Sequence, residues 1–395
     1  MVQPVKKVIK EIHPELTNKT IYTLLVDGTN ILRRCFSDTK VNTNGVHYGG
    51  IFQFLLQLKK MMQTKTYDYI YVFFDDSDSG ILRYKIYNDY KANRDKNYAE
   101  HADGISDYMK EVNAKIKSMQ NYLYNKNKKK KEKSDSEKLV DENFARERDR
   151  LCEYFNELFI RWIFNDKTEG DDLIAYYVLN KKPEEKIVIM SADEDLTQLI
   201  SSSVCIYNPN LKKYLSYDNF IKYRGIPVEN VLIKKIFCGD TSDNIGNIDG
   251  LSENRLFELI PEIKERPITI DEVKEKARLL NEQRIKEKKK PLKVYENIIN
   301  GVSRKNYNGD FYEINDKIIN LKKPLLTDEA KEDIDNMMYV TQDPSDRSMV
   351  NVYKMVEEDD ILDLLDHDKF SNFFSSYKPF IDNEIRRYKE DCKKE

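Results

Sequence analysis

Two stretches of the chain decide the predicted fold: Thr-Glu-Gly-Asp-Asp-Leu-Ile-Ala at 168–175 and Ile-Val-Ile-Met-Ser-Ala-Asp-Glu-Asp-Leu at 187–196. The first predicts the start of a helix, because Thr168 is a good N-cap and apolar residues follow at helical spacing. The second predicts a buried parallel strand that ends in acidic residues. Ligands of parallel sheets bind beyond the carboxyl ends of the strands. We therefore expect one crevice, with a cation to relieve the repulsion, for the carboxylates of Glu169, Asp171, Asp172, Asp193 and Asp195.

The same pattern of acidic residues recurs elsewhere in the chain. The apolar runs 21–26 and 69–74 end in Asp27 and Asp75, and Asp240 and Asp243 lie three residues apart in a later segment. Each acid alone has an ordinary structural explanation as a turn residue, a helix-dipole partner or a cap. The coincidence of the clusters favours a site for Mg²⁺ or Mn²⁺, which prefer oxygen ligands. Two such ions roughly 4 Å apart can clamp the attacking and leaving oxygens of a phosphodiester.

Other classes of protein find less support in the sequence. A phosphoryl-aspartate hydrolase needs a second Asp two residues after its nucleophile, whereas Asp27 is followed by Gly28 and Thr29. The four histidines show no ligand spacing, and the five scattered cysteines predict free thiols in a reducing compartment. We expect no membrane span and a cytoplasmic location, because no apolar run reaches about 18 residues and the N-terminus has no signal-peptide core.

The chain of 395 residues can form two domains or one elaborated domain. Its net charge of -3 is compatible with basic patches, because an acidic metal site would offset their charge. We expect an α/β fold with a mostly parallel central sheet flanked by helices. The charged, tyrosine-rich insertion cannot bury a core of its own, and we expect its tip, 126–138, to be unstructured. The expected segments are an N-terminal extension (1–20), the core (21–82 and 154–230, with strands at 187–190 and 204–207), the insertion (83–153) and a helical C-terminal region (263–395). An amphipathic stretch at 151–162 leads from the insertion back into the core.

Six short blocks occur in an order that resembles the 5′-nuclease family, which includes flap endonucleases and the 5′→3′ exonuclease domain of bacterial polymerase I. The blocks are Val-Asp-Gly (26–28), Phe-Phe-Asp (73–75), Tyr-Lys-Ala-Asn-Arg (90–94), Glu-Gly-Asp-Asp (169–172), Ser-Ala-Asp-Glu-Asp (191–195) and Gly-Asp-Thr-Ser-Asp-Asn (239–244). Within the family, the tracts 195–199 and 207–214 are most similar to the ribonucleases H of T-even bacteriophages. The resemblance implies a PIN-like nuclease core, with 83–153 as a helical arch that takes up the substrate.

The resemblance also implies residue roles. Two Mg²⁺ ions, replaceable by Mn²⁺, would be held by acids at nine positions: Asp27, Asp75, Glu169, Asp171, Asp172, Asp193, Asp195, Asp240 and Asp243. The implied catalytic residues are Asp27, Asp75, Asp172 and Asp193, with Lys91 and Arg94 at the base of the arch, near the scissile phosphate. The implied nucleic-acid contacts are Arg33, Asn44, Gly45, Arg83, Lys91 and Arg94.

Residues 231–262 fall where the family has a helix-turn-helix that grips duplex DNA, often around a K⁺ ion. Here the expected Gly-Ile-Gly turn is missing, and Asp249 and Glu253 are acidic, which argues against K⁺ and weakens the expected grip. The insertion is also longer than expected for a phage relative, so its role in threading substrate is only an inference from the resemblance.

The implied reaction is hydrolysis of phosphodiesters near 5′ ends of RNA–DNA hybrid, duplex or flap DNA, with removal of RNA primers in phage replication. The expected partners are these nucleic acids and a single-strand DNA-binding protein or sliding clamp. The expected state is a monomer, in the host cytoplasm if the chain is phage-encoded. Two alternatives stay open: a non-catalytic nucleic-acid-binding replication protein on a nuclease-like core, and a PIN-class single-strand ribonuclease.

Overall fold

The computed structural model describes residues 20–36, 47–76, 78–92, 135–365 and 370–394. The N-terminal extension, apart from residue 20, and most of the insertion lie outside these ranges, as do Asn44, Gly45 and Arg94. Of the tip expected to be unstructured, residues 126–134 are not described, whereas 135–138 begin a helix, α5 (Asp135–Glu157), and correct that expectation.

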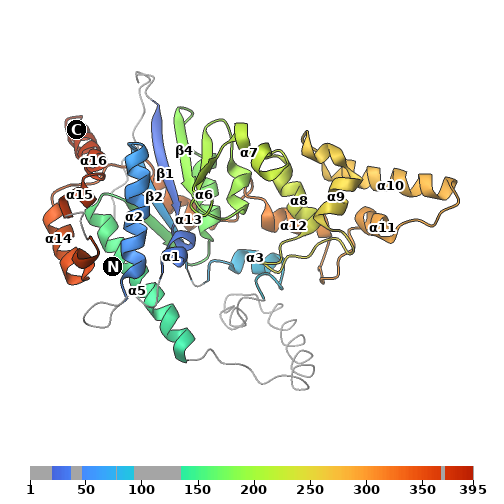
Figure 1. Cartoon of the computed structure of the whole chain (residues 1–395), viewed down its shortest axis with the longest axis horizontal. Coiled ribbons are helices and arrows are strands. Elements are labelled where there is room, and N and C mark those ends of the chain that lie inside the picture. The colour runs from blue at the N-terminus through green and yellow to red at the C-terminus, as the bar shows by residue number, and fades with distance from the viewer. Residues whose placement is uncertain (1–19, 37–46, 77, 93–134, 366–369, 395) are drawn as a thin grey trace.

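A six-stranded sheet in the order β3-β2-β1-β4-β5-β6 forms the centre of the molecule (Figure 1). Its first five strands pair in parallel, and only β6 at the edge is antiparallel. The predicted α/β fold with a mostly parallel sheet is therefore confirmed. The strands are β1 (Ile21–Asp27), β2 (Tyr69–Asp75), β3 (Arg161–Asn165), β4 (Glu185–Met190), β5 (Val204–Asn208) and β6 (Lys213–Leu215).

Helices cover both faces of this sheet because alternate strand residues point to opposite sides. Leu24 and Val26 of β1 belong to one core and Leu25 to the other. The first core also contains residues of α1 (Gly28–Cys35), α2 (Gly49–Thr64), α5, α14 (Met349–Glu358), η4 (Ile361–Leu364), α15 (Phe370–Phe374) and α16 (Lys378–Asp391). The second contains residues of α6 (Gly170–Leu179), η2 (Asp195–Leu199), α7 (Tyr217–Arg224), α8 (Asn230–Cys238) and α13 (Asp328–Met337).

A separate core holds together the helices that follow the sheet. Phe237, Leu256, Val273 and Ile298 are all buried in it. Figure 1 shows these helices extending from one end of the sheet along the long axis of the molecule, while α14–α16 lie at the other end. Besides α8, they are α9 (Glu253–Leu259), η3 (Pro261–Lys264), α10 (Ile270–Lys286), α11 (Lys293–Asn300) and α12 (Phe311–Ile319), and α12 also contacts α3 (Ile81–Ile86).

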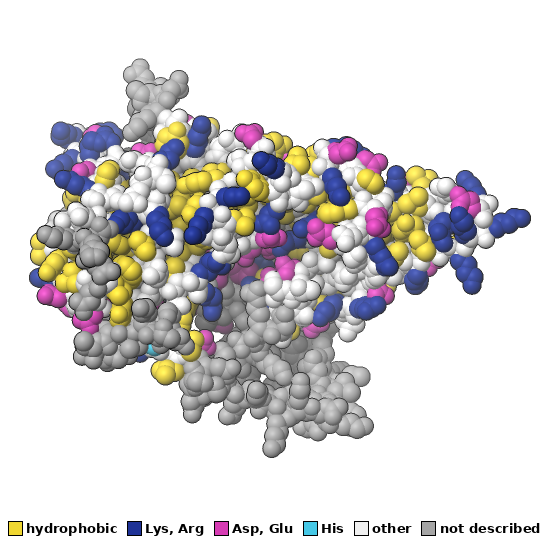
Figure 2. All heavy atoms as spheres, in the orientation of Figure 1, with side chains coloured by type: hydrophobic (Ala, Val, Ile, Leu, Met, Phe, Trp, Pro, Cys, Tyr) yellow, Lys and Arg dark blue, Asp and Glu magenta, His cyan; other side chains and the backbone are white. Residues whose placement is uncertain are grey.

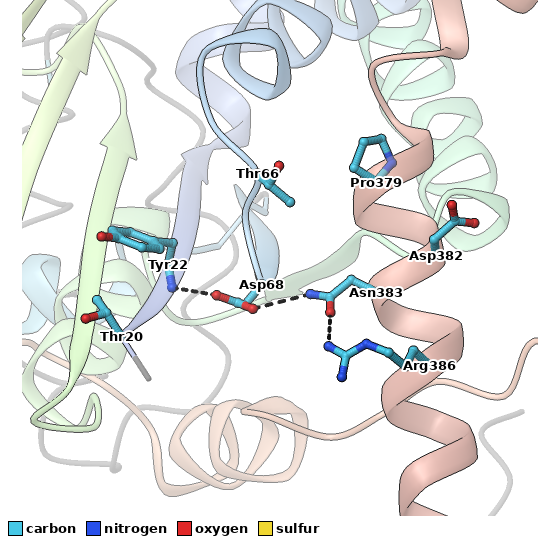
Figure 3. Close-up of a pocket in the computed structure, with 8 residues that line it drawn as sticks. All are labelled: Thr20, Tyr22, Thr66, Asp68, Pro379, Asp382, Asn383 and Arg386. Atoms are coloured by element: carbon cyan, nitrogen blue, oxygen red, sulfur yellow. Dashed lines mark hydrogen bonds between the residues drawn. The ribbon is translucent and has the colours of Figure 1, made fainter. Parts of the chain in front are cut away.

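The C-terminal region is helical, and its second half returns to the sheet. Arg161 of β3 and Glu384 of α16, both buried, form a bidentate ion pair with N–O distances of 2.7 and 3.1 Å. Figure 3 shows α16 beside the N-terminal end of β1, where Asp68 accepts hydrogen bonds from the Tyr22 N–H and from Asn383. A cavity of about 720 Å³ lies between them. Among the helices that the structure describes, none has the length and apolar character that crossing a membrane requires.

Candidate active site

A cavity of about 210 Å³ lies at the carboxyl ends of the central strands, and eight of the nine predicted acidic residues line it. Figure 2 shows acidic side chains gathered in a recess near the middle of the molecule. The acids that line the cavity are Asp27, Asp75, Glu169, Asp171, Asp193, Asp195, Asp240 and Asp243. Segments far apart in the sequence therefore bring their carboxylates to one place, as the parallel sheet predicts.

Four of these acids, Asp27, Asp75, Asp171 and Asp193, form what we call the strand-end group. Asp27 caps α1 and accepts a hydrogen bond from the Ser191 hydroxyl at 2.7 Å. Asp75 accepts one from the Gly170 N–H, also at 2.7 Å. A Cβ atom at Gly170 would lie 3.2 Å from the Asp75 carboxylate, so this glycine lets α6 begin directly against β2.

The strand-end group is electrostatically strained. Burial, together with Asp75 and Asp193, raises the pKa of Asp27 to about 7 against the hydrogen bond from Ser191. Burial also raises the pKa of Asp75, although the Lys91 ammonium opposes the shift. The pKa of Asp171 is raised well above its usual value by burial and by neighbouring acids, Asp193 first. Clustered carboxylates whose ionisation is this unfavourable are the expected electrostatics of a site that takes a cation.

Three further acids, Asp195, Asp240 and Asp243, form what we call the loop group. Each offers a carboxylate oxygen that lies within 4.8 Å of the others. Lys235 of α8 donates to Asp240 at 2.8 Å and also contacts Asp195. Burial would raise the pKa of Asp240, but Lys235 and hydrogen bonds from Ser242 outweigh it and lower the pKa to about 2.

The eighth acid, Glu169, also has basic partners. Its carboxylate lies 2.6 Å from the Lys91 ammonium and 3.1 Å from the Arg83 guanidinium, and it accepts a hydrogen bond from Tyr90. Burial would raise the pKa of Glu169, but Arg83 and then Lys91 outweigh it and lower the pKa to about 2. Lys91 has a left-handed backbone, φ 51°, and its N–H donates to the Asp243 carbonyl at 2.8 Å, which fixes it beside both groups.

The structure places Asp172 differently from the expectation, in an ion pair with Arg83. Asp172 does not line the cavity; it is fully buried behind it, in a bidentate pair with Arg83, and accepts the Leu325 N–H at 2.9 Å. Arg83 is 5% exposed and also bonds the Ile318 carbonyl. These two residues form an internal ion pair, which argues against Asp172 as a metal ligand. Arg83 also lines the cavity, and its contact with nucleic acid stays a prediction. Arg33 lines the cavity as an exposed side chain at the end of α1.

Several residues that hold the acids were not predicted from the sequence. Ser191 and Thr29 each bond a strand-end residue, Thr29 by accepting the Asp75 N–H at 2.7 Å. Tyr90 donates to Glu169 and lies 3.3 Å from the Asp243 carboxylate. Lys235 precedes Asp240 by five residues in an ordinary amphipathic helix, so nothing in the local pattern distinguished it. The available signal was adjacency, because Thr29, Tyr90 and Ser191 each lie within two residues of a predicted site residue.

An α/β sheet with carboxylates gathered beyond its central strands defines a class of resolvase-like and PIN-like nucleases. The model of the "5′-3′ exonuclease, N-terminal resolvase-like domain" family matches residues 22–224. The chain belongs to this family, and the predicted 5′-nuclease membership is confirmed.

Individual relatives match at lower similarity. The chain is 26% identical over 267 residues to a 5′-3′ exonuclease of Bacillus subtilis (strain 168), which covers 65% of this chain and 74% of that protein. It is 36% identical over 97 residues to a 5′-3′ exonuclease of Mycoplasmopsis pulmonis, but this match spans only 24% of this chain and 33% of that protein. The structure of the T5 5′-exonuclease with bound zinc has a TM-score of 0.54 and 16% identity, covering 80% of this chain and 97% of that one, which shows a shared fold.

The donor atoms of the cavity suit divalent metal ions. Those from the eight acids are carboxylate oxygens, the ligands that hard cations such as Mg²⁺ and Mn²⁺ prefer. The raised pKa values of Asp27, Asp75 and Asp171 show that the nearby positive charge, such as that of Lys91 beside Asp75, does not outweigh burial and mutual repulsion in the strand-end group. Among the described residues, the three acids of the loop group already bring their oxygens within 4.8 Å of one another and would hold one ion. The strand-end group, whose acids repel one another, would hold another.

Proposed function

We propose that the chain is a divalent-metal-dependent nuclease that cleaves phosphodiesters near 5′ ends, as a 5′→3′ exonuclease and flap endonuclease. The observation that carries this proposal is the single cavity that unites acids from the ends of β1, β2 and β4, the start of α6 and the loop after α8. Bound divalent cations would supply Lewis-acid activation of water and neutralise charge on the phosphate. The substrates we propose are RNA–DNA hybrid, duplex DNA and flap DNA.

Different residues of the cavity have different roles in the proposed reaction. The strand-end and loop groups hold the cations, Mg²⁺ or in its place Mn²⁺. Lys91 lies against Glu169 at the cavity and can offset charge that develops on a phosphate there. Arg33, exposed at the rim, contacts the nucleic-acid backbone. Arg83, held by Asp172 behind the cavity, positions Glu169. Asn44, Gly45 and Arg94 remain predicted substrate contacts.

The proposal is tested by cleavage of 5′-labelled flap, nicked, hybrid and single-stranded RNA substrates, with EDTA and then with added Mg²⁺ or Mn²⁺. We expect cleavage near the 5′ end that EDTA abolishes and Mn²⁺ restores. The variant Asp193→Asn should lose cleavage while it still binds the flap substrate. Wild-type cleavage by this variant would overturn the site assignment.

Two results would favour the alternatives. Binding without cleavage of any substrate under all metal conditions would indicate a non-catalytic replication protein. Cleavage confined to single-stranded RNA would indicate a PIN-class ribonuclease.

We propose removal of RNA primers during phage replication as the biological role. It is supported by the likeness of 195–199 and 207–214 to the T-even bacteriophage ribonucleases H. Action as a monomer, together with a single-strand DNA-binding protein or sliding clamp, belongs to the same proposal. Preference for a hybrid over an all-DNA duplex of the same sequence would support it, and equal cleavage would not.

A further inference from the structure

The helices α10 and α11 form a hairpin at one end of the long axis of the molecule. Figure 1 shows α8 and α9 between the sheet and this hairpin. The base of α10 is anchored by Val273 and Ala277, both fully buried in the core formed by α8–α12. Its other end carries the turn that leads into α11, well away from the acidic cavity.

The tip of this hairpin, which we define as residues 284–293, is strongly basic although the chain as a whole is acidic. It contains six basic residues and one acidic residue, Glu287, against a net charge of -3 for the chain. Figure 2 shows Lys and Arg side chains gathered at this end of the molecule. The basic residues are Arg284, Lys286, Lys288, Lys289, Lys290 and Lys293.

Most of this charge is unneutralised. Lys289 pairs with Glu287 and Lys293 with Glu296, at 2.7 and 3.4 Å, but their side chains stay 60% and 80% exposed. Within the described part of the chain, Lys286, Lys288 and Lys290 are exposed and pair with no carboxylate. Exposed pairs of this kind contribute little to stability, so the lysines are not explained by the fold.

The backbone of the tip is held in one shape. The Arg284 side chain donates to the Lys290 carbonyl at 2.9 Å, and the Lys289 N–H donates to the Arg284 carbonyl at 2.8 Å. The Leu292 N–H donates to the side chain of Asn281, which is only 7% exposed, at 2.8 Å. Lys288 takes a left-handed conformation, φ 58°. The charges are therefore presented on a structured turn that ends a packed hairpin.

We propose that the hairpin tip binds the phosphate backbone of the substrate's duplex arm, as a second contact remote from the cavity. This rests on the proposed function, in which the chain acts on nucleic acid. Clustered lysines bind phosphates as point charges, independently of base sequence. An acidic protein partner would need an anchoring pocket beside the charges, and neither cavity described above borders the tip.

For a duplex arm that runs parallel to α10, the extra length of duplex that the tip requires is given by the length of this helix. Its 17 residues rise about 25 Å at 1.5 Å per residue. At 3.4 Å per base pair, that length corresponds to about 7 or 8 base pairs. A duplex that only reaches α9 should therefore miss the tip, whereas one longer by about 8 base pairs or more can reach it.

The test compares the full chain with a triple variant, Lys286→Gln, Lys288→Gln and Lys290→Gln. A matched control carries Lys354→Gln, Lys378→Gln and Lys389→Gln, exposed lysines of α14 and α16 at the opposite end of the molecule. Binding to flap DNA with a short or a long duplex arm, of about 8 or about 20 base pairs, is measured by fluorescence anisotropy in EDTA at several salt concentrations.

For the long arm, the tip variant should bind at least about tenfold more weakly at low salt, with a salt slope smaller in magnitude by about 2 to 3. The short arm and the control variant should show neither change. Three results would overturn the proposal: equal losses of affinity on both arms, equal losses in the control variant, or unchanged binding by the tip variant. The last result would favour an acidic protein as the partner of the tip. Because binding is measured without metal, failure of the nuclease function would appear separately, as absence of cleavage by the wild type.

Discussion

The two acidic groups of the cavity differ in where their positive charge comes from. In the strand-end group the pKa of Asp27 is raised to about 7, and the pKa values of Asp75 and Asp171 are raised as well. The loop group has an internal cation, Lys235, and the pKa of Asp240 is lowered to about 2. One group therefore depends on an external cation for its charged form, whereas the other is already compensated by the protein.

This difference predicts unequal affinity for metal ions. A divalent ion that enters the strand-end group relieves repulsion among the acids, which adds to its binding free energy. An ion that enters the loop group must first displace the ammonium of Lys235 from Asp240 and Asp195. We expect the strand-end group to bind the first ion and the loop group to bind a second ion more weakly.

The largest expected effects come from substitutions at two adjacent residues, Asp171 and Asp172, of which one should affect cleavage and the other stability. Asp171→Asn removes a carboxylate of the cavity and should lower cleavage at least about a hundredfold, because ligands of a catalytic metal tolerate little change. Asp172→Asn breaks a buried ion pair with Arg83 and should lower the free energy of unfolding by about 3 kcal/mol. Flap cleavage at saturating Mg²⁺ and urea unfolding measure the two effects.

Each of these variants is the control for the other. Asp171→Asn should leave the stability of the metal-free protein unchanged or higher, since it removes a carboxylate that others repel. Asp172→Asn should keep cleavage within about tenfold of wild type while it remains folded. If Asp172→Asn abolished cleavage without loss of stability, Asp172 would be a metal ligand. The assignment of Asp171 to the metal site and of Asp172 to a structural ion pair would then be wrong.

The sequence could not distinguish these two residues, although it predicted most of the cluster. Consecutive helical residues point about 100° apart, so only one of the pair can face the cavity. Which one does so depends on Arg83, whose position relative to α6 is set by tertiary packing. The strand-end acids Asp27 and Asp75 were predictable because each directly follows an apolar run.

The strands of the sheet were also predictable only where the local sequence pattern determines them. The runs that became β1, β2, β4 and β5 were predicted from apolar residues bounded by polar ones. Strand β3 was not, because its first residue is Arg161 and the residues before it continue an amphipathic pattern. Arg161 is accommodated in the sheet by Glu384, 223 residues away, and no local pattern reveals such a partner.

The second prediction concerns pH and the metal-free protein. The pKa of Asp27 is about 7 when folded and about 3.9 when unfolded. Between these values the folded state binds more protons, so the free energy of unfolding should fall as pH rises, by about 2 kcal/mol from about pH 5 to about pH 7. The fall should continue more weakly above about pH 7 and end above about pH 8, where Asp27 is ionised in both states. Urea unfolding in EDTA across this range measures the fall, and Asp27→Asn should make it smaller by about this amount.

Other acids titrate as well. The pKa values of Asp75 and Asp171 are also raised and these acids repel Asp27, so the comparison with Asp27→Asn measures Asp27 together with its interaction with them. Glu169 and Asp240, whose pKa values are lowered to about 2, stabilise the fold at neutral pH and lose that contribution only below about pH 4. Burial also raises the pKa of Glu147 to about 7, so the measured quantity is the difference between wild type and Asp27→Asn. An identical pH dependence in the two proteins would show that Asp27 is already ionised without metal. This result would contradict the difference in charge between the strand-end group and the loop group.

The smallest expected effect tests the role of Lys235 as the internal cation. Lys235→Gln removes the ammonium that a second ion must displace, so the weaker class of Mn²⁺ sites should tighten by about tenfold, which is about 1.4 kcal/mol. Mn²⁺ binding in the absence of DNA, followed by electron paramagnetic resonance, measures both classes of site. Lys234→Gln is the matched control, because the neighbouring Lys234 pairs with Glu253 rather than with the loop group. Weaker Mn²⁺ binding by Lys235→Gln would mean that the lysine holds Asp195 and Asp240 in position for the metal. The difference in positive charge between the strand-end group and the loop group would then not predict which group binds metal more tightly.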